Sequence, residues 1–379
     1  MKRKSHPLRF VVLVLCALFL LTLFSGKTLY DAGELGSVFD HPLPGCVLHK
    51  NITGAEDLVT VDEGRTVLIS AFDRHDISKV KVVPGIYIYT EGASPRLLQA
   101  IDGNPHGISS YPSELGYHVH VVVHKPGEDD RVEIYEWKTA EQTFTRIKTI
   151  PFAGIQQLNG IVAMADDSFF ASQDFGYPAG PLQEIEKAFR LPLGKIWYYN
   201  GTSDKPQIAR EDILYPNGLA ISPDKKHLYL ASLTGRSLID YDLDIDDKGE
   251  VTLKWRREWP LYTAPDNLKW AGDTLLIGSH RKLISLLLHS FDSKRYHAAS
   301  QLIQVSGLPD KLIVKELHST RSGGVEGVST GVLSTVNNRI VMGGIWSEGL
   351  LDCEGTDTFP LTHSTIPSTG NLTVPESAP

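Results

Sequence analysis

Residues 216–232 read PNGLAISPDKKHLYLAS, and this stretch decides the fold class. A polar start leads into alternating apolar residues, a charged tip follows, and a second apolar segment ends in small residues. Alternation with a period of two is typical of a β-strand, and a polar tip between two such segments is typical of a hairpin. The stretch therefore predicts two antiparallel strands.

The same pattern recurs along the chain at intervals of roughly 50 to 60 residues, a spacing typical of propeller blades that each contain four short strands. The six copies are residues 55–70, 104–123, 158–172, 216–232, 265–279 and 327–344. Further β-rich pieces between them, such as GIYIYT at 85–90, would supply the outer strands. The sequence predicts an all-β fold, a six-bladed β-propeller. A sandwich or barrel is the alternative.

The composition agrees with this architecture. The chain has 379 residues, of which 41% are hydrophobic and 22% charged, so it can bury a large core, and wholesale disorder is excluded. The 33 Gly and 22 Pro residues favour short strands joined by turns over a helical bundle. The formal net charge is −8 and no basic cluster follows the first ten residues, which argues against a nucleic-acid partner.

The N-terminus carries a secretory signal. Basic residues precede an apolar run at 10–24, which fits a signal-peptide core better than the roughly 20 residues of a membrane-spanning helix. Leu23 and Phe24 are bulky where a cleavage site needs small side chains, so residues 1–27 are either a cleaved signal or a retained type II anchor in contact with the membrane. Either way we expect a lumenal or extracellular body.

We expect the rest of the chain to divide into a linker at 28–45, a propeller at 46–355 and a flexible tail at 356–379, which is rich in Ser, Thr and Pro. Three N-x-[ST] sequons agree with passage through the secretory pathway and are candidate glycosylation sites. They lie at Asn51, Asn200 and Asn371.

The cysteines point to a ring closure. Cys16 lies in the apolar run, which leaves Cys46 and Cys353 near the two ends of the folded region. In an oxidising compartment we expect these two to pair, and the bridge would stabilise the domain by up to roughly 5 kcal/mol in the chain-entropy model. A propeller commonly closes its ring by sharing one blade between the two chain termini, and a disulfide there would lock that closure. Two unrelated free thiols are the alternative.

Polar residues begin the first strand of five copies. Because the innermost strands of a propeller line its channel, equivalent positions converge at one mouth, and Asn and Asp are poor strand formers whose recurrence favours a shared site over separate turns. These residues are Glu56, Asp57, His106, Asn159, Asn217, Asp266 and Asn267. Carboxylates and carboxamides offer hard oxygens, so Ca²⁺ is the best match, and its 6–8 ligands leave room for a substrate oxygen.

The sequence with these polar positions resembles the serum paraoxonase/arylesterase family. The resemblance runs from about Cys46 to Cys353 and rests on an ordered set of segments, GAEDL at 54–58, NPHGIS at 104–109, LNGIVA at 158–163, NGLAISPD at 217–224 and the pair Asp266-Asn267. It implies a six-bladed propeller that hydrolyses lactones and aryl esters with a calcium ion in its channel.

Residue by residue, the resemblance assigns roles to the polar positions. The implied ligands of the catalytic calcium are Glu56, Asn159, Asn217, Asp266 and Asn267. His106 matches the histidine usually assigned to water activation, His124 is the candidate for its partner, and His280 matches a histidine that lines the pocket. Cys46 and Cys353 match the closing disulfide.

One position departs from the family pattern. The family's second, structural calcium uses the residue after the first-site Glu, a backbone carbonyl of the NPHGI segment and an Asp after the Asn of the third blade. Asp57 and Ile108 match, but the third position is Gly160, which has no side chain to donate. Because ligand charge sets calcium affinity, we predict one tightly held calcium ion rather than two.

The sequence therefore predicts a calcium-dependent hydrolase of small lactones or aryl esters. A gluconolactonase-type hydrolase, strictosidine-synthase-like chemistry and a membrane-tethered binding propeller without catalysis are the alternatives. Residues 181–191 predict a short amphipathic helix with Leu182, Ile185 and Phe189 on one face. That face would cover the channel mouth, touch a membrane or pack on the propeller.

Overall fold

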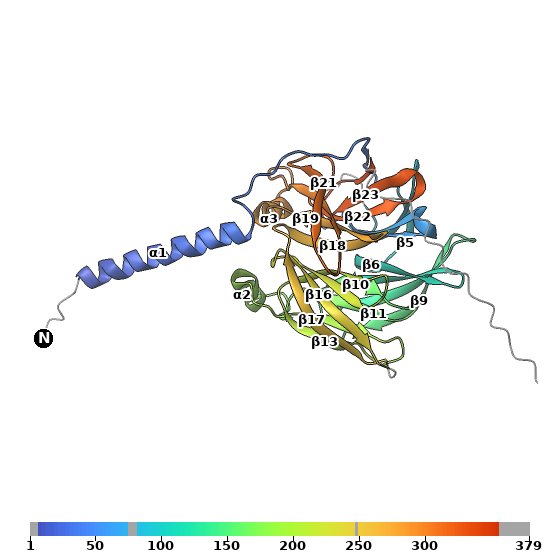
Figure 1. Ribbon diagram of the computed structural model, residues 1–379, viewed down its shortest axis with the longest axis horizontal. Coiled ribbons are helices and arrows are strands. Elements are labelled where there is room, and N and C mark those ends of the chain that lie inside the picture. The colour runs from blue at the N-terminus through green and yellow to red at the C-terminus, as the bar shows by residue number, and fades with distance from the viewer. Residues whose placement is uncertain (1–6, 75–81, 247–248, 356–379) are drawn as a thin grey trace, which may run out of the picture.

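The computed structural model describes residues 7–74, 82–246 and 249–355, and side chains from residue 10 onward (Figure 1). The predicted tail at 356–379, and with it the sequon at Asn371, lies outside the described residues. Strands dominate the description, and the only helices in it longer than one turn are α1 (Pro7–Asp31), α2 (Pro181–Phe189) and α3 (Leu283–Phe291).

The described strands form six four-stranded antiparallel sheets, the blades of a propeller. Blade 1 contains β2 (Ala55–Val61), β3 (Thr66–Ala71), β4 (Gly85–Thr90) and β5 (Arg96–Ala100). Blade 2 contains β6 (Asn104–Ser113), β7 (Gly116–His124), β8 (Arg131–Lys138) and β9 (Thr143–Pro151). Blade 3 contains β10 (Leu158–Ala163), β11 (Phe169–Gln173), β12 (Gly194–Tyr199) and β13 (Gln207–Ile213).

The second half of the ring repeats this order. Blade 4 contains β14 (Pro216–Ile221), β15 (His227–Ser232), β16 (Ser237–Ile245) and β17 (Val251–Pro260). Blade 5 contains β18 (Ala264–Ala271), β19 (Thr274–His280), β20 (Ser300–Ser306) and β21 (Ile313–Thr320). Blade 6 contains β22 (Val328–Ser334), β23 (Arg339–Gly344), β24 (Leu350–Glu354) and the N-terminal β1 (Val47–His49). Short 3₁₀ turns, η1 (Asp62–Gly64) and η2 (Val336–Asn338), connect the first two strands of blades 1 and 6.

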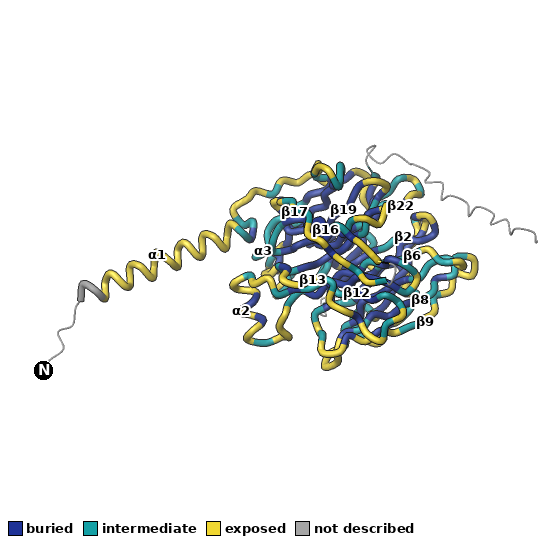
Figure 2. The backbone as a smooth tube through the Cα atoms, turned by 60° about the horizontal axis from the view of Figure 1, so that its bottom comes forward, coloured by how far each residue is buried: buried dark blue, intermediate teal, exposed yellow. Residues whose placement is uncertain are grey.

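Each predicted hairpin forms the two innermost strands of one blade, so the propeller prediction is confirmed. The inner strands β2, β6, β10, β14, β18 and β22 contact one another in this order, and β22 contacts β2 again. Six hydrophobic clusters fill the interfaces between consecutive blades, and Leu68, Ile108 and Trp137, for example, are fully buried between blades 1 and 2. Figure 2 shows the buried strands around the axis.

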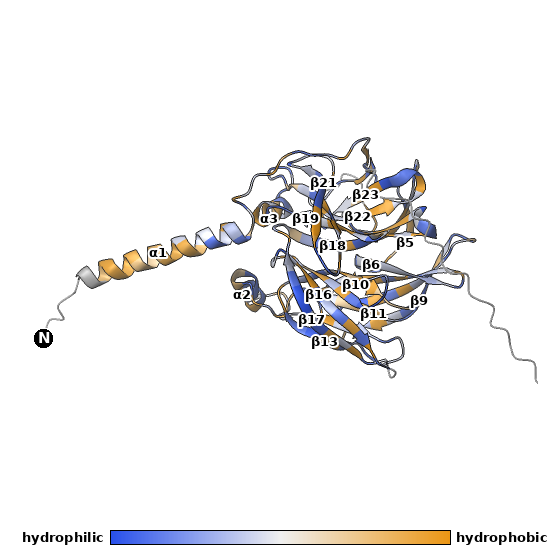
Figure 3. Cartoon of the chain, viewed as in Figure 1, coloured by the Kyte–Doolittle hydropathy of each residue, from blue (hydrophilic) through white to orange (hydrophobic). Residues whose placement is uncertain are grey.

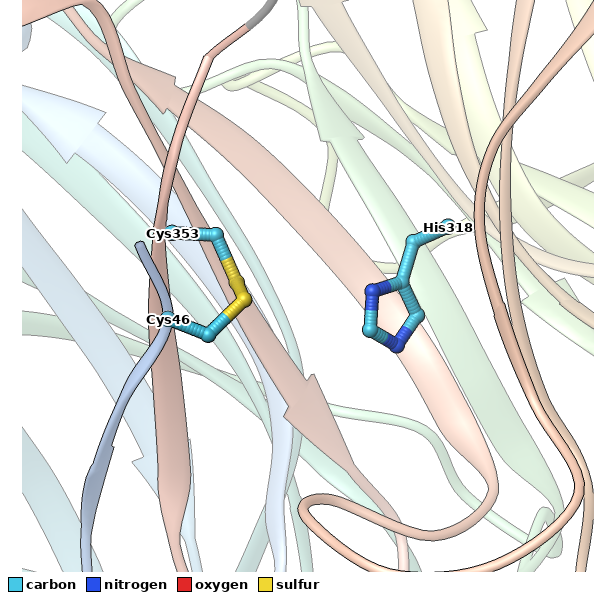
Figure 4. A group of neighbouring side chains, drawn as sticks. All are labelled: Cys46, His318 and Cys353. Carbon is cyan, nitrogen blue, oxygen red and sulfur yellow. A yellow bond between two sulfur atoms is a disulfide. The ribbon is translucent and has the colours of Figure 1, made fainter. Parts of the chain in front are cut away.

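The ring closes in blade 6, where β1 pairs with β24 from the other end of the chain. The predicted disulfide between Cys46 and Cys353 lies at this seam and spans 307 positions of sequence (Figure 4). His318 lies beside the two sulfur atoms, which are committed to the disulfide, and its Nδ1 accepts a hydrogen bond from the Leu43 amide at 3.3 Å. Burial lowers the pKa of His318 to about 4, so it remains a neutral acceptor at this seam.

Helix α1 extends beyond the predicted apolar run and projects away from the propeller (Figures 1 and 3). By length and composition, Phe10–Asp31 could cross a membrane, and this segment has a mean hydropathy of 2.3. Helix α2 confirms the predicted helix, but Leu182, Ile185 and Phe189 are 56%, 49% and 64% exposed. The alternative in which this apolar face packs on the propeller is therefore wrong.

We expect the closing disulfide to contribute a large share of the stability of the propeller. Replacing Cys353 by Ala should lower the melting temperature by about 10 °C, because the open chain regains conformational entropy when it unfolds. Thermal unfolding followed by circular dichroism would measure the shift. The matched control is Cys16→Ala, which removes a cysteine that forms no disulfide. A reductant should lower the melting temperature of the wild type and leave that of Cys353→Ala unchanged.

Candidate functional site

The candidate site lies where the inner strands begin. In every blade the pairing register between the first two strands shifts at this level, for example between Ala55 and Asp57 and between Pro105 and Ile108. A β-bulge inserts extra residues that are not paired and re-aims their side chains. Apart from Asp57, which pairs with Ser70, the polar positions singled out in the sequence are the bulge residues, so the backbone presents them at one end of the channel.

Glycines allow the bulges of neighbouring blades to approach closely. A β-carbon added to Gly160 would lie 2.6 Å from the carbonyl oxygen of Asn217, and one added to Gly107 would lie 2.4 Å from that of Asn159. These distances are shorter than real contacts of a β-carbon. Side chains at these positions would force the inner strands apart, so the tight ring depends on glycine.

Five of the predicted site residues come together and are called the donor ring below. They are Glu56, Asn159, Asn217, Asp266 and Asn267, all buried. Asn267 Nδ2 donates a hydrogen bond to Glu56 Oε1 at 3.0 Å, which joins blades 5 and 1. His280 Nε2 lies 2.7 Å from Asp266 Oδ2, so the predicted pocket histidine contacts the donor ring.

Three oxygens of the donor ring have no hydrogen-bond partner although they are buried. They are Glu56 Oε2, Asn159 Oδ1 and Asn217 Oδ1, and they come from three different blades. Because buried polar atoms are rarely left unpaired, this set indicates a ligand that the protein itself does not supply. Oxygen donors of this kind fit a hard cation such as Ca²⁺.

The charges of the carboxyl groups support the same conclusion. Burial, helped by the charges of Asp266 and Glu56, raises the pKa of Asp174 to about 8 against the opposing effects of His106 and Asn159. Burial likewise raises the pKa of Asp266, against the opposing effect of His280. For Glu56, burial raises the pKa, but the charge of His106 and its hydrogen bonds outweigh burial and lower the pKa to about 2. Mutual repulsion among carboxylates is relieved by a bound cation.

A chain of hydrogen bonds runs from the donor ring toward the outside of blade 2. His106 Nε2 lies 3.5 Å from Glu56 Oε1, and His106 Nδ1 lies 2.9 Å from His124 Nε2. His124 Nδ1 in turn lies 2.7 Å from Asp130 Oδ1. The other oxygen of Asp130 accepts a hydrogen bond from the Leu158 amide at 2.8 Å, which fixes the carboxylate.

This chain determines the tautomers of both histidines. An ionised Asp130 can only accept, so His124 donates from Nδ1 and accepts at Nε2. His106 therefore donates from Nδ1, and its Nε2, which faces the Glu56 carboxylate, donates when the ring is protonated and is an acceptor when the ring is neutral. Burial lowers the pKa of His124, and this favours its neutral form. Burial also lowers the pKa of His106, but the neighbouring Glu56 carboxylate raises it by more.

A cavity of about 310 Å³, called the site cavity below, lies next to this chain. His106, His124, Asp174 and Arg74 line it together with apolar Phe72 and Leu158. Asp174 Oδ2 accepts a hydrogen bond from Asn159 Nδ2 at 3.2 Å, so it also supports the donor ring.

Sequence analysis missed Asp130, Asp174 and Arg74. A signal for Asp174 was present, because it directly follows the second strand of its blade, and His124 and His280 end the second strands of theirs. In an antiparallel hairpin this end lies beside the start of the first strand. Asp130 and Arg74 lie in loops, where one sequence offers no comparable pattern.

Asp57 and Ile108, the matches to a second calcium site, also come together. The Ile108 amide donates a hydrogen bond to Asp57 Oδ2 at 2.9 Å. The Asp57 carboxylate also contacts the ammonium group of Lys269 from blade 5. Burial raises the pKa of Asp57, and the Lys269 ammonium, 2.9 Å from its Oδ2, opposes that rise.

Comparisons with known proteins agree with the geometry. The chain is 25% identical to human serum paraoxonase/arylesterase 1 over 328 residues, which cover 82% of this chain and 89% of that protein. It is 30% identical to the mouse serum paraoxonase/arylesterase 1 over 215 residues, 53% of this chain and 59% of the mouse protein.

Solved structures show the same fold at lower identity. A gluconolactonase from Xanthomonas campestris superimposes with a TM-score of 0.53 at 14% identity and covers 84% of this chain and 98% of its own. A luciferin-regenerating enzyme superimposes with a TM-score of 0.52 at 16% identity, covering 83% and 96%. The family model "Arylesterase" matches residues 94–354, well over half of the sequence. The chain therefore belongs to the arylesterase family.

Proposed function

We propose that this protein is a calcium-dependent hydrolase of lactones or aryl esters. The observation that carries the proposal is a set of three unpartnered buried oxygens, from Glu56, Asn159 and Asn217, at the bulges of closely packed inner strands, together with the hydrogen-bonded chain that begins at His106. Membership of the arylesterase family supports hydrolysis of esters or lactones as the reaction class.

The donor ring would hold the metal ion. Calcium held there would supply Lewis-acid polarisation of a substrate carbonyl and stabilisation of the negative charge that develops on its oxygen. The carboxylates of Glu56 and Asp266 supply charge, and the amide oxygens of Asn159, Asn217 and Asn267 supply neutral ligands. Hydrogen bonds to His280 and Asn267 orient the two carboxylates before any ligand binds.

His106 would activate the attacking water. Its Nε2 faces the donor ring, and in the neutral ring this nitrogen would be the acceptor that takes a proton from a water molecule there. His124 then stabilises the protonated ring by accepting the hydrogen bond from Nδ1, and Asp130 holds His124 in the required tautomer. Neutralisation of Glu56 by a cation would lower the affinity of His106 for a proton and keep it ready to act as a base.

The site cavity favours a small substrate. Its volume of about 310 Å³ is near the lower limit for ligand pockets, which suits a small molecule. Phe72 and Leu158 offer apolar contacts to a ring or acyl chain, and Arg74 adds a cationic group to the lining. The apolar helix α1 and the disulfide support delivery of the propeller to the secretory pathway, where calcium is abundant and thiols are oxidised.

Removal of calcium should abolish hydrolysis. With phenyl acetate and δ-valerolactone as probes, dialysis against EDTA should reduce the rate to background, and added calcium should restore it. Added magnesium should not restore the rate, because Mg²⁺ requires a smaller, octahedral site. A rate that persists after chelation would contradict the proposal. Calcium-dependent melting without turnover of either probe would instead favour a binding propeller.

Replacement of His106 by Gln should lower kcat by roughly 100-fold or more while the bound calcium and the melting temperature stay unchanged, because only proton transfer is lost. Steady-state kinetics with both probes and elemental analysis would measure the two properties. His118→Gln, on the adjacent strand β7, is the matched control and should retain the wild-type rate. An unchanged rate in His106→Gln would remove the histidine from the mechanism.

Replacement of Asp130 by Asn tests the hydrogen-bonded chain. The Asn amide can donate to His124 Nδ1, which would reverse both tautomers and place a proton on the His106 nitrogen that faces the channel. We expect kcat to fall by roughly 100-fold to 10,000-fold with little change in KM, by analogy with other Asp–His pairs. Asp129→Asn changes the neighbouring carboxylate, which accepts a hydrogen bond from the Gly154 amide, and should leave kcat unaffected.

A further inference from the structure

Lys269 inserts an ammonium group into the channel wall beside the donor ring. Its Nζ lies 2.9 Å from Asp57 Oδ2 and 2.9 Å from the carbonyl oxygen of Ile108. The lysine comes from β18, the carboxylate from β2 and the carbonyl from β6, so one charged group joins blades 5, 1 and 2. The Lys269 side chain is only 13% exposed and that of Asp57 only 1% exposed.

The partners of this ammonium are the two groups that match a second, structural calcium site. A divalent ion at this position would need the Asp57 carboxylate and the Ile108 carbonyl, and Lys269 already binds both. The third match, Gly160, offers no ligand, and a β-carbon there would lie 2.6 Å from the Asn217 carbonyl oxygen and 2.9 Å from the Gly218 Cα. The residues present therefore do not fit a second calcium ion.

Electrostatics lead to the same conclusion. The pair of Asp57 and Lys269 is neutral, so it offers a second divalent cation no net attraction, and the ammonium would repel that cation at close range. The donor ring differs from this ion pair, because three of its oxygens have no hydrogen-bond partner and remain available to a cation. A cavity of about 310 Å³ at the far ends of the inner strands is lined by Lys269, and it is separate from the site cavity.

We propose that the Lys269 ammonium is a built-in cation that takes the place of a structural calcium ion and excludes a second divalent ion from the channel. It ties three blades together without any metal, so the closure of the ring at this level does not depend on calcium. The inference concerns the number of ions and the stability of the ring, and it is independent of whether the protein hydrolyses esters.

The test compares calcium binding by the wild type and by Lys269→Ser, which removes the ammonium and leaves space. Calcium bound per chain would be measured by equilibrium dialysis at millimolar calcium followed by elemental analysis. We expect Lys269→Ser to bind one equivalent more than the wild type. Equal numbers for the two proteins, or two equivalents on the wild type, would overturn the proposal. A wild type that binds no calcium would contradict only the assignment of the donor ring as a metal site. The difference in bound calcium between Lys269→Ser and the wild type would still measure binding at the second site.

Stability in EDTA gives an independent readout. Lys269→Ser should melt about 10 °C below the wild type in EDTA, because Asp57 is left buried without its cation, and millimolar calcium should restore most of this loss. The matched control is Lys225→Ser, whose lysine lines the same cavity but contacts the Tyr111 hydroxyl and the Met164 carbonyl, not a carboxylate. It should gain no calcium. A melting temperature of Lys269→Ser in EDTA equal to that of the wild type would count against the proposal.

A second pair of variants covers the case in which Lys269→Ser does not fold. Lys269→Gln should lower the melting temperature, and Asp57→Asn added to it should recover part of the loss, because the double variant leaves no buried unpaired charge. Additive losses would show that the two groups do not compensate each other and would refute the built-in cation. Two equivalents of calcium on the wild type would overturn the proposal whether or not the variants fold.

Discussion

The structure depends on the closure of six inner strands around one axis. A closed ring removes the free edges that an open array of sheets would expose, and it must be completed by a chain whose two ends meet. In this protein the meeting occurs in blade 6, where β1 pairs with β24 and the Cys46–Cys353 disulfide covers the seam. The same closure forces the bulges at the start of the inner strands into contact, and glycines at positions such as 107 and 160 make that contact possible.

Closure also buries several carboxyl groups, and their charges are compensated in two ways. Glu56, Asp57 and Asp266 are buried and Asp174 is partly buried, and burial, together with the charge of Glu56, raises the pKa of the three Asp residues. The charge of Asp57 is compensated permanently, because the Lys269 ammonium contacts its carboxylate in the folded chain. The carboxyl groups of Glu56, Asp174 and Asp266 are partnered instead by hydrogen-bond donors and histidines, and some of the oxygens in this region remain without a hydrogen-bond partner. A carboxylate with its own cation is structural, whereas one that lacks a full partner remains able to bind a ligand.

The hairpin pattern predicted the fold because each copy contains both strands of the local pairing, so periodicity and turn residues suffice. It also predicted the donor ring, because equivalent positions of a repeat must converge around an axis. It did not predict helix α3, Asp130 or the partnership of Lys269 with Asp57, which are 212 positions apart. Gly160 indicated that a ligand was missing, but only the folded chain shows which group compensates, since Lys269 is an ordinary polar residue of a strand in the sequence.

The two ends of the channel differ in what surrounds them. Helices α2 and α3 follow the second strands β11 and β19, whose ends carry Asp174 and His280, so both helices lie on the side of the donor ring. Helix α1 is joined to that side, because Phe24 contacts Phe189 of α2 and the carbonyl of Ala32 accepts a hydrogen bond from the amide of Leu283 in α3. Helices α1, α2 and α3 lie on one side of the molecule (Figure 1), so the membrane-length helix and the donor ring share that side. The cavity that Lys269 lines is formed by the other ends of the inner strands. It follows that the groups that would perform chemistry lie near the N-terminal helix, whereas the fixed ion pair stabilises the ring behind them.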